Sequence, residues 1–249
     1  MSAPRNIVVL GASGGIGRAL CDALAARPET EQLHLVVRNP ESLADSVTEN
    51  NTEGPKQQVH QADITSEADL ARLAAAVGTP DMILVATGLL SDATTGLRPE
   101  KSYRQQDMAA FEQVFRVNTI GPALVAKHLL DRMPRDRRTV FAALGARVGS
   151  ISDNRLGGWH AYRASKAALA MLIRSYAIEM ARRNPQAICV CLHPGTVRTP
   201  LSAPFRGAVP EHRLFAPEEA AAHLLKVLDG LIPEDSGNQY DWAGKRIPA

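Results

Sequence analysis

Tyr162 and Lys166 are the two residues of this 249-residue chain whose types and spacing most directly suggest chemistry. They lie four positions apart in a stretch with a helical pattern, so both side chains extend from the same face of the expected helix. An ammonium group beside a phenol favours the phenolate and lowers the phenol pKa from its usual value of about 10. Such a tyrosine can exchange a proton with a carbonyl oxygen near neutral pH. The same spacing is common on ordinary surface helices, so the pair alone does not establish an active site.

A glycine-rich turn near the start of the chain provides a candidate phosphate site. Residues 10–17 read Leu-Gly-Ala-Ser-Gly-Gly-Ile-Gly and join an expected strand to an expected helix. Backbone N–H groups in such a turn can approach a phosphate, and the positive end of the helix dipole favours the anion. Gly11 permits a tight turn, Gly15 a close approach and Gly17 the packing of helix against strand. The spacing G-x-x-x-G-x-G differs from the G-x-G-x-x-G fingerprint, and such turns also occur for purely topological reasons.

Two residues after the second and third expected strands bear on which nucleotide would bind. Arg38 closes the strand expected at Leu33–Val37, where the ribose 2′ position of a dinucleotide lies in doubly wound sheets. An arginine there suits the extra phosphate of NADP, whereas an acidic residue suits NAD, and a solvated strand end is the third interpretation. Asp63 is expected either to accept a hydrogen bond from the adenine amino group or to cap the next helix. We therefore expect NADP, with NAD as the alternative.

Strand and helix patterns alternate along the chain and would position these residues. Such alternation predicts a single α/β domain over residues 1–249, a Rossmann-type doubly wound parallel sheet of about seven strands with helices on both faces. Thr87–Arg104 and Pro194–Phe215 are expected to be loops. The expected strands are Asn6–Leu10, Leu33–Val37, Gln57–Gln61, Met82–Ala86, Thr139–Leu144, Ala187–Leu192 and Gln239–Trp242; the expected helices are Gly15–Arg27, Glu41–Val47, Glu67–Val77, Gln105–Arg132 with an interruption near Gly121-Pro122, His160–Arg182 and Pro217–Leu228.

The composition excludes several classes of protein. With 45% hydrophobic and 22% charged residues the chain is typical of globular proteins rather than disordered ones. A formal net charge of +2 and only 4% aromatic residues argue against a nucleic-acid surface. The apolar runs are too short to span a bilayer and no signal peptide is visible. Three cysteines favour reduced thiols, so we expect a soluble cytoplasmic protein that binds neither nucleic acid, membrane nor metal.

Several motifs occur in order and together resemble the short-chain dehydrogenase/reductase family over essentially the whole chain. They are Gly11-x-x-x-Gly15-x-Gly17, Asn118 in the fourth long helix, Tyr162-Arg-Ala-Ser-Lys166 and Pro194-Gly195-Thr-Val197-Arg-Thr199. The stretches 143–152, 157–159 and 240–244 are further similar to the branch that contains C-factor and sniffer-type carbonyl reductases.

The resemblance implies a role for each matching residue. Tyr162 would be the general acid in carbonyl reduction, and Lys166 would lower its pKa and bind the nicotinamide ribose. Asn118 would hold a water in a proton relay; the plainer interpretation is a helix asparagine bonding a local carbonyl. The residues expected to contact the cofactor are Gly11, Ser13, Gly14, Gly15, Ile16, Gly17, Arg38, Asp63, Ile64, Ala86, Thr87, Gly88, Tyr162, Lys166, Pro194, Gly195, Val197 and Thr199.

The chain departs from the family pattern at the usual catalytic serine. That serine lies three residues before a glycine, which here would be Gly149, and the position holds Ala146. The alanine side chain has no donor that could form a hydrogen bond to a substrate carbonyl. We expect Ser150 to substitute, with Ser152 as a second candidate; a Ser-Ile-Ser turn with local hydrogen bonds is the alternative.

The expected function is that of an NAD(P)-dependent oxidoreductase that interconverts a carbonyl and an alcohol on a small or medium substrate. The alternative is a nucleotide-binding signalling or regulatory protein, similar to C-factor, with weakened catalysis. The resemblance also implies a homodimer or homotetramer. The loops that would choose the substrate carry no motif, so the sequence does not identify the compound.

Overall fold

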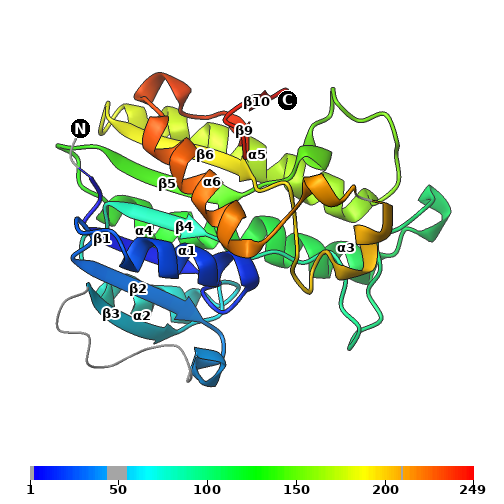
Figure 1. Ribbon diagram of the computed structural model, residues 1–249, viewed down its shortest axis with the longest axis horizontal. Coiled ribbons are helices and arrows are strands. Elements are labelled where there is room, and N and C mark those ends of the chain that lie inside the picture. The colour runs from blue at the N-terminus through cyan, green and yellow to red at the C-terminus, as the bar shows by residue number, and fades with distance from the viewer. Residues whose placement is uncertain (1–2, 44–54, 209) are drawn as a thin grey trace.

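An eight-stranded sheet forms the centre of the computed structural model, which describes residues 3–43, 55–208 and 210–249 (Figure 1). Its strand order is β10-β9-β6-β5-β4-β1-β2-β3. Neighbouring strands pair in parallel except β9 and β10, which are antiparallel. The strands are β1 (Asn6–Leu10), β2 (Gln32–Val37), β3 (Lys56–Gln61), β4 (Met82–Val85), β5 (Thr139–Leu144), β6 (Ala187–His193), β9 (Gln239–Asp241) and β10 (Arg246–Ile247). From β1 the chain first adds β2 and β3 on one side and then β4, β5 and β6 on the other side. The expected doubly wound sheet is therefore confirmed.

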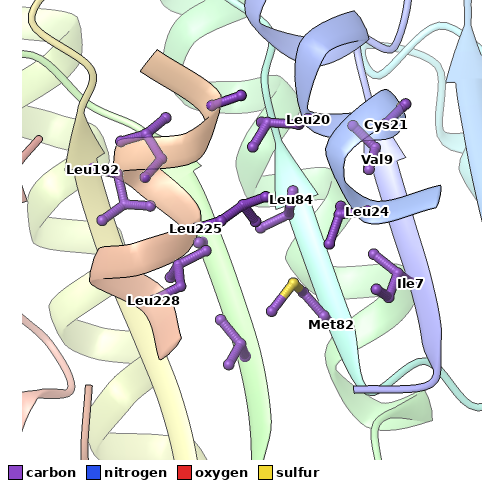
Figure 2. Close-up of a cluster of buried hydrophobic side chains, with 14 of the residues drawn as sticks. Ile7, Val9, Leu20, Cys21, Leu24, Met82, Leu84, Leu192, Leu225 and Leu228 are labelled. Atoms are coloured by element: carbon purple, nitrogen blue, oxygen red, sulfur yellow. The ribbon is translucent and has the colours of Figure 1, made fainter. Parts of the chain in front are cut away.

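Helices cover both faces of the sheet. One face carries α1 (Gly15–Ala25) and α6 (Pro217–Gly230). In Figure 2, Leu20 and Leu24 of α1 and Leu225 of α6 lie over strand residues such as Leu84. The other face carries α2 (Glu67–Ala76), α4 (Gly121–Leu129) and α5 (His160–Ala181), while α3 (Met108–Phe115) precedes α4. Because both faces are covered, β1, β4, β5 and β6 are apolar except at their ends, where Asn6, Thr139 and His193 lie.

The long helix expected at Gln105–Arg132 is interrupted, as the sequence predicts, but the interruption is a π-helical turn. It spans Arg116–Ile120 between α3 and α4. The N–H of Gly121 bonds the Arg116 carbonyl, five residues earlier, and Pro122 has no N–H to continue an α-helical ladder. Gly121 also permits close packing, because a Cβ there would lie 2.5 Å from Ile64 Cδ1. Asn118 lies in the middle of this turn.

The remaining differences from expectation concern short elements. At Glu41–Val47 the structure has a 3₁₀ turn over Pro40–Leu43, and the rest of that expected helix lies outside the described residues. The expected loop Pro194–Phe215 contains β7 (Thr196–Val197) paired with β8 (Leu214–Phe215). These pairs are too short for a periodic pattern to reveal them. Within the described ranges, no helix combines the length and the apolar character that crossing a bilayer requires.

Candidate active site

The glycine turn after β1 has the backbone geometry that only glycine supplies. Gly11 has φ of +85°, and a Cβ there would lie 3.0 Å from Thr87 Cγ2. A Cβ on Gly17 would lie 2.1 Å from the Gly11 carbonyl oxygen, so α1 packs directly on the turn. Helix α1 begins at Gly15, and Gly14 precedes it in an extended conformation. The N-terminus of α1 is therefore reached by a tight turn at the carboxyl end of β1.

A groove of about 660 Å³ lies beside this turn. Its lining comes from the ends of β1, β2, β3 and β4, where ligands bind in open α/β sheets. The Thr87 hydroxyl oxygen is buried and has no hydrogen-bond partner among the described residues, so it is available to a ligand. The expected cofactor residues that line the groove are Gly11, Ser13, Gly14, Arg38, Asp63, Ile64, Ala86, Thr87 and Gly88.

Arg38 and Asp63 follow the carboxyl ends of β2 and β3, as the sequence predicts. Arg38 is exposed and lines the groove directly after β2. One Asp63 carboxylate oxygen accepts from the N–H and the hydroxyl of Thr65, each at 2.8 Å. The helix α2 is capped by Ser66 rather than by Asp63. The capping alternative for Asp63 is therefore wrong, and its carboxylate faces a turn that borders the groove.

Tyr162 and Lys166 are both buried on α5 and lie close together, as their spacing predicts. The Lys166 Nζ lies 5.8 Å from the centroid of the Tyr162 ring and donates to the Leu144 carbonyl at 2.7 Å. Burial raises the pKa of Tyr162 to about 12 and lowers the pKa of Lys166 to about 8. The direction for Tyr162 is opposite to the sequence expectation, because removal of the phenol from water outweighs the ammonium at this distance. Tyr162 is therefore protonated at neutral pH.

A second cavity, of about 270 Å³, lies beside Tyr162. Five further expected cofactor residues line it, namely Ile16, Pro194, Gly195, Val197 and Thr199. The other walls are mainly apolar and include Leu90, Ala146, Val148, Leu201 and Phe205. Leu90, Leu201 and Phe205 come from loops whose sequence carries no motif, so the sequence does not reveal them, whereas Ala146 and Val148 lie in the stretch 143–152. Lys166, Gly15 and Gly17 line neither cavity, although a Cβ on Gly88 in the groove would lie 3.8 Å from Lys166 Nζ.

Trp159 forms one wall of this cavity in a strained backbone conformation. It is the only described non-glycine residue with positive φ, at 52°, and it follows Gly157 and Gly158, which are also left-handed. Its N–H donates to the carbonyl of Glu100 at 2.5 Å, and the buried Glu100 carboxylate accepts from Ala161 N–H. The indole meets the Tyr162 ring edge-on, with centroids 6.2 Å apart, and lies 5.0 Å from the Phe205 centroid. Strain of this kind clusters at functional sites.

Asn118 connects α3–α4 to two other parts of the site. Its side-chain oxygen accepts from Leu89 N–H at 2.8 Å, and its amide donates to the Leu89 carbonyl at 2.8 Å and to the Ser165 hydroxyl at 3.1 Å. Both amide hydrogens are therefore used within the protein. The expected water-holding role of Asn118 stays a prediction. The alternative, a bond from the amide to a carbonyl, is formed, but its partner Leu89 follows β4 rather than lying in the same helix.

The expectation that Ser150 replaces the missing serine is corrected by its position. The Ser150 hydroxyl accepts from Asp153 N–H at 3.1 Å and lies 3.5 Å from the Ala249 carbonyl oxygen. Ser152 also donates to the Ala249 oxygen, and neither serine is among the residues that line the cavity beside Tyr162. A 3₁₀ turn over Arg147–Gly149 takes the chain away from the cavity before Ser150 is reached. Ala146 itself does line the cavity and contributes no polar group.

The chain is similar in sequence and in structure to several known proteins. A family model described as short chain dehydrogenase matches residues 5–209. The C-signal protein of Myxococcus xanthus is 35% identical over 142 residues, which are 57% of this chain and 80% of that protein. An NADPH-bound carbonyl reductase from chicken fatty liver has a TM-score of 0.81 at 24% identity, covering 98% of this chain and 99% of that one. The carbonyl reductase Sniffer of D. melanogaster has a TM-score of 0.82 at 20% identity, covering 98% and 100%.

Proposed function

The chain belongs to the short-chain dehydrogenase family of oxidoreductases, and from that premise we propose that it interconverts a carbonyl and an alcohol with NADPH as the hydride donor. The observation that carries the proposal is Tyr162 at the wall of an apolar cavity, with Lys166 Nζ 5.8 Å from the centroid of its ring, beside a glycine-turn groove that could hold a dinucleotide.

The residues of the groove fit a dinucleotide. The N–H groups of Ser13, Gly15 and Ile16, at the N-terminus of α1, would hold the pyrophosphate, while the Gly14 N–H donates to the Gly11 carbonyl at 3.0 Å. Thr87 would direct its unpartnered hydroxyl oxygen, and Asp63 its carboxylate, toward the adenosine half. Val197 and Thr199 would hold the nicotinamide carboxamide at the second cavity. When bound there, the reduced nicotinamide would supply hydride to a carbonyl carbon.

Arg38 supports NADP over NAD. Its guanidinium is exposed at the end of β2, where the adenosine ribose would lie. A guanidinium can bind a phosphate through two parallel hydrogen bonds, and no carboxylate takes that position to bind a free 2′-hydroxyl.

Tyr162 and Lys166 would carry out the proton transfer. Because its pKa is about 12, Tyr162 holds its proton at neutral pH and can donate it to the carbonyl oxygen as the alcohol forms. Lys166 is mainly charged at pH 7, since its pKa is about 8, and its ammonium would stabilise the phenolate left behind. In the reverse reaction the phenolate would accept the proton of the alcohol.

The cavity walls favour an apolar carbonyl compound. Apolar walls of Leu90, Val148, Leu201 and Phe205 together with the Trp159 indole would bury the part of the substrate next to the carbonyl. The volume of about 270 Å³ suits a small or medium compound.

Titration of the purified protein with NADPH and NADH, followed by fluorescence, tests the proposal first. The same sample is then given a panel of ketones, aldehydes and quinones, with NADPH oxidation as the readout. NADPH binding together with turnover of one panel member supports the reductase. Binding without turnover would instead favour a nucleotide-binding regulatory protein. Catalysis would then be weak because Ala146 offers no hydrogen-bond donor to a substrate.

A further inference from the structure

We propose that His193 donates to the substrate carbonyl oxygen the hydrogen bond that no side chain at position 146 can supply. The inference rests on the proposed function, because it assigns a residue to the carbonyl oxygen of that reaction. His193 is the last residue of β6. The neighbouring strand β5 ends at Leu144 and is followed by Gly145 and Ala146.

The strand pattern places His193 on the same face of the sheet as Tyr162. Alternate residues of β6 point to opposite faces, and Cys189 and Cys191 belong to the core cluster beneath α5. His193, two positions after Cys191, therefore faces α5 as well. Leu144 pairs with Leu192, so His193 lies beside Gly145 at the next position of the parallel ladder.

Small residues line the cavity together with this imidazole. Gly145 has no side chain and Ala146 only a methyl group, and both line the cavity beside Tyr162 together with His193. The chain therefore places an imidazole at the cavity wall next to the position where the family pattern has a hydroxyl group.

The imidazole is available as a donor. Neither ring nitrogen has a hydrogen-bond partner among the residues that the structure describes. Burial and the nearby Arg147 guanidinium lower the pKa of His193 to about 4, against a smaller opposite effect of Asp241. The ring is therefore neutral at pH 7 and carries one N–H donor.

The other polar side chains of the cavity are either hydrogen-bonded within the protein or lie in the segment proposed to bind the cofactor. The Arg147 guanidinium bonds Asp153 and Asp241, each at 3.0 Å. The Ser202 hydroxyl donates to the Val197 carbonyl. Thr196 and Thr199 belong to the segment proposed to hold the nicotinamide. His193 is thus the side chain best placed to join the Tyr162 hydroxyl at the carbonyl oxygen, where negative charge develops as hydride arrives.

Four variants test this role with NADPH and 9,10-phenanthrenequinone, a flat apolar diketone. They are His193→Leu, His193→Gln, Ala146→Ser and the double variant Ala146→Ser/His193→Leu. Loss of one such donor lowers kcat by about 10²- to 10³-fold in other enzymes, so we expect His193→Leu to lower kcat by about 10²-fold. NADPH affinity, followed by fluorescence, stays unchanged. His193→Gln keeps an N–H donor and retains more activity.

Rescue distinguishes a hydrogen bond from a structural role. A serine hydroxyl at position 146 replaces the lost donor, so Ala146→Ser raises kcat more in the His193→Leu protein than in the unaltered protein. The proposal is overturned if His193→Leu keeps its kcat, or if its loss is not relieved by Ala146→Ser while NADPH still binds. An unaltered protein that binds NADPH but turns over neither this quinone nor any panel compound overturns the proposed function, and the role of His193 with it.

Discussion

The side-chain amide of Asn118 and the backbone of Leu89 exchange two hydrogen bonds of 2.8 Å, one in each direction. The amide thereby bonds Leu89 as a neighbouring strand would, and it joins the segment after β4 to the π-helical turn of the α3–α4 helix. A third bond, to Ser165, reaches α5 between Tyr162 and Lys166. One buried side chain thus links three elements that border the groove and the cavity.

Replacement of Asn118 by leucine should destabilise the protein. It leaves the N–H and carbonyl of Leu89 without their partners, and an unsatisfied buried polar group costs about 1–3 kcal/mol. Urea unfolding followed by circular dichroism measures the loss in the free energy of unfolding. The exposed Glu112→Gln on α3 is the control and should change it by less than about 0.5 kcal/mol. Equal stability of the two variants would contradict the linking role.

Replacement of Trp159 by leucine should weaken binding of apolar substrates. The change removes the indole that packs on Tyr162 and Phe205 and enlarges the cavity. Loss of apolar contact in a hydrophobic pocket costs about 1–3 kcal/mol of substrate binding free energy, so KM for an aromatic ketone should rise about tenfold or more. The matched control is Leu156→Ala in the same loop, since Leu156 is 90% exposed. An unchanged KM in Trp159→Leu would exclude the indole as a substrate wall.

Replacement of Arg38 by aspartate should reverse the preference between the two nucleotides. A hydrogen bond to a charged group is worth about 1.5–3 kcal/mol, so NADPH affinity should fall about 10- to 100-fold. NADH affinity should fall less or rise, because a carboxylate can accept from the ribose 2′-hydroxyl. Fluorescence titration measures both, with the exposed Arg155→Asp as the control for the change in charge. Equal losses for both nucleotides would place Arg38 away from the 2′ position.

The pH dependence should follow Lys166. Burial holds its pKa at about 8, below the usual 10.5, so the ammonium is present below pH 8 and is lost as the pH rises through that value. Since kcat/KM for NADPH reports groups of the free enzyme, it should decline about tenfold per pH unit above about 8. Tyr162 does not limit this range, because its pKa is about 12. A profile that stays flat to about pH 10 would contradict the assignment of the charge to Lys166.

The sequence predicts well whatever depends on local pattern. Buried parallel strands read as apolar runs, and the i, i+4 spacing brings Tyr162 and Lys166 together on α5. The glycine turn is equally local, because positive φ at Gly11 and close packing at Gly17 require glycine itself.

The parts of the site that the sequence predicts poorly depend on distant contacts. Ser150 lies near Ala146 in sequence, but a turn and the Ala249 backbone take its hydroxyl away from the cavity. Asn118 bonds Leu89 from a different element, and no spacing rule reveals that pair. The phenol pKa depends on burial by residues from several loops, and therefore its direction is visible only in the fold.

Comparison of Tyr162→Phe with the unaltered protein tests the central claim most directly. The variant removes only the hydroxyl, and the control is Tyr103→Phe, since Tyr103 is 65% exposed and is not among the residues that line the cavity. A general acid contributes about 10²- to 10⁴-fold, so carbonyl reduction by Tyr162→Phe should fall by that factor while NADPH affinity is kept. Tyr103→Phe should behave as the unaltered protein. Reduction by Tyr162→Phe at the unaltered rate would contradict proton donation by Tyr162.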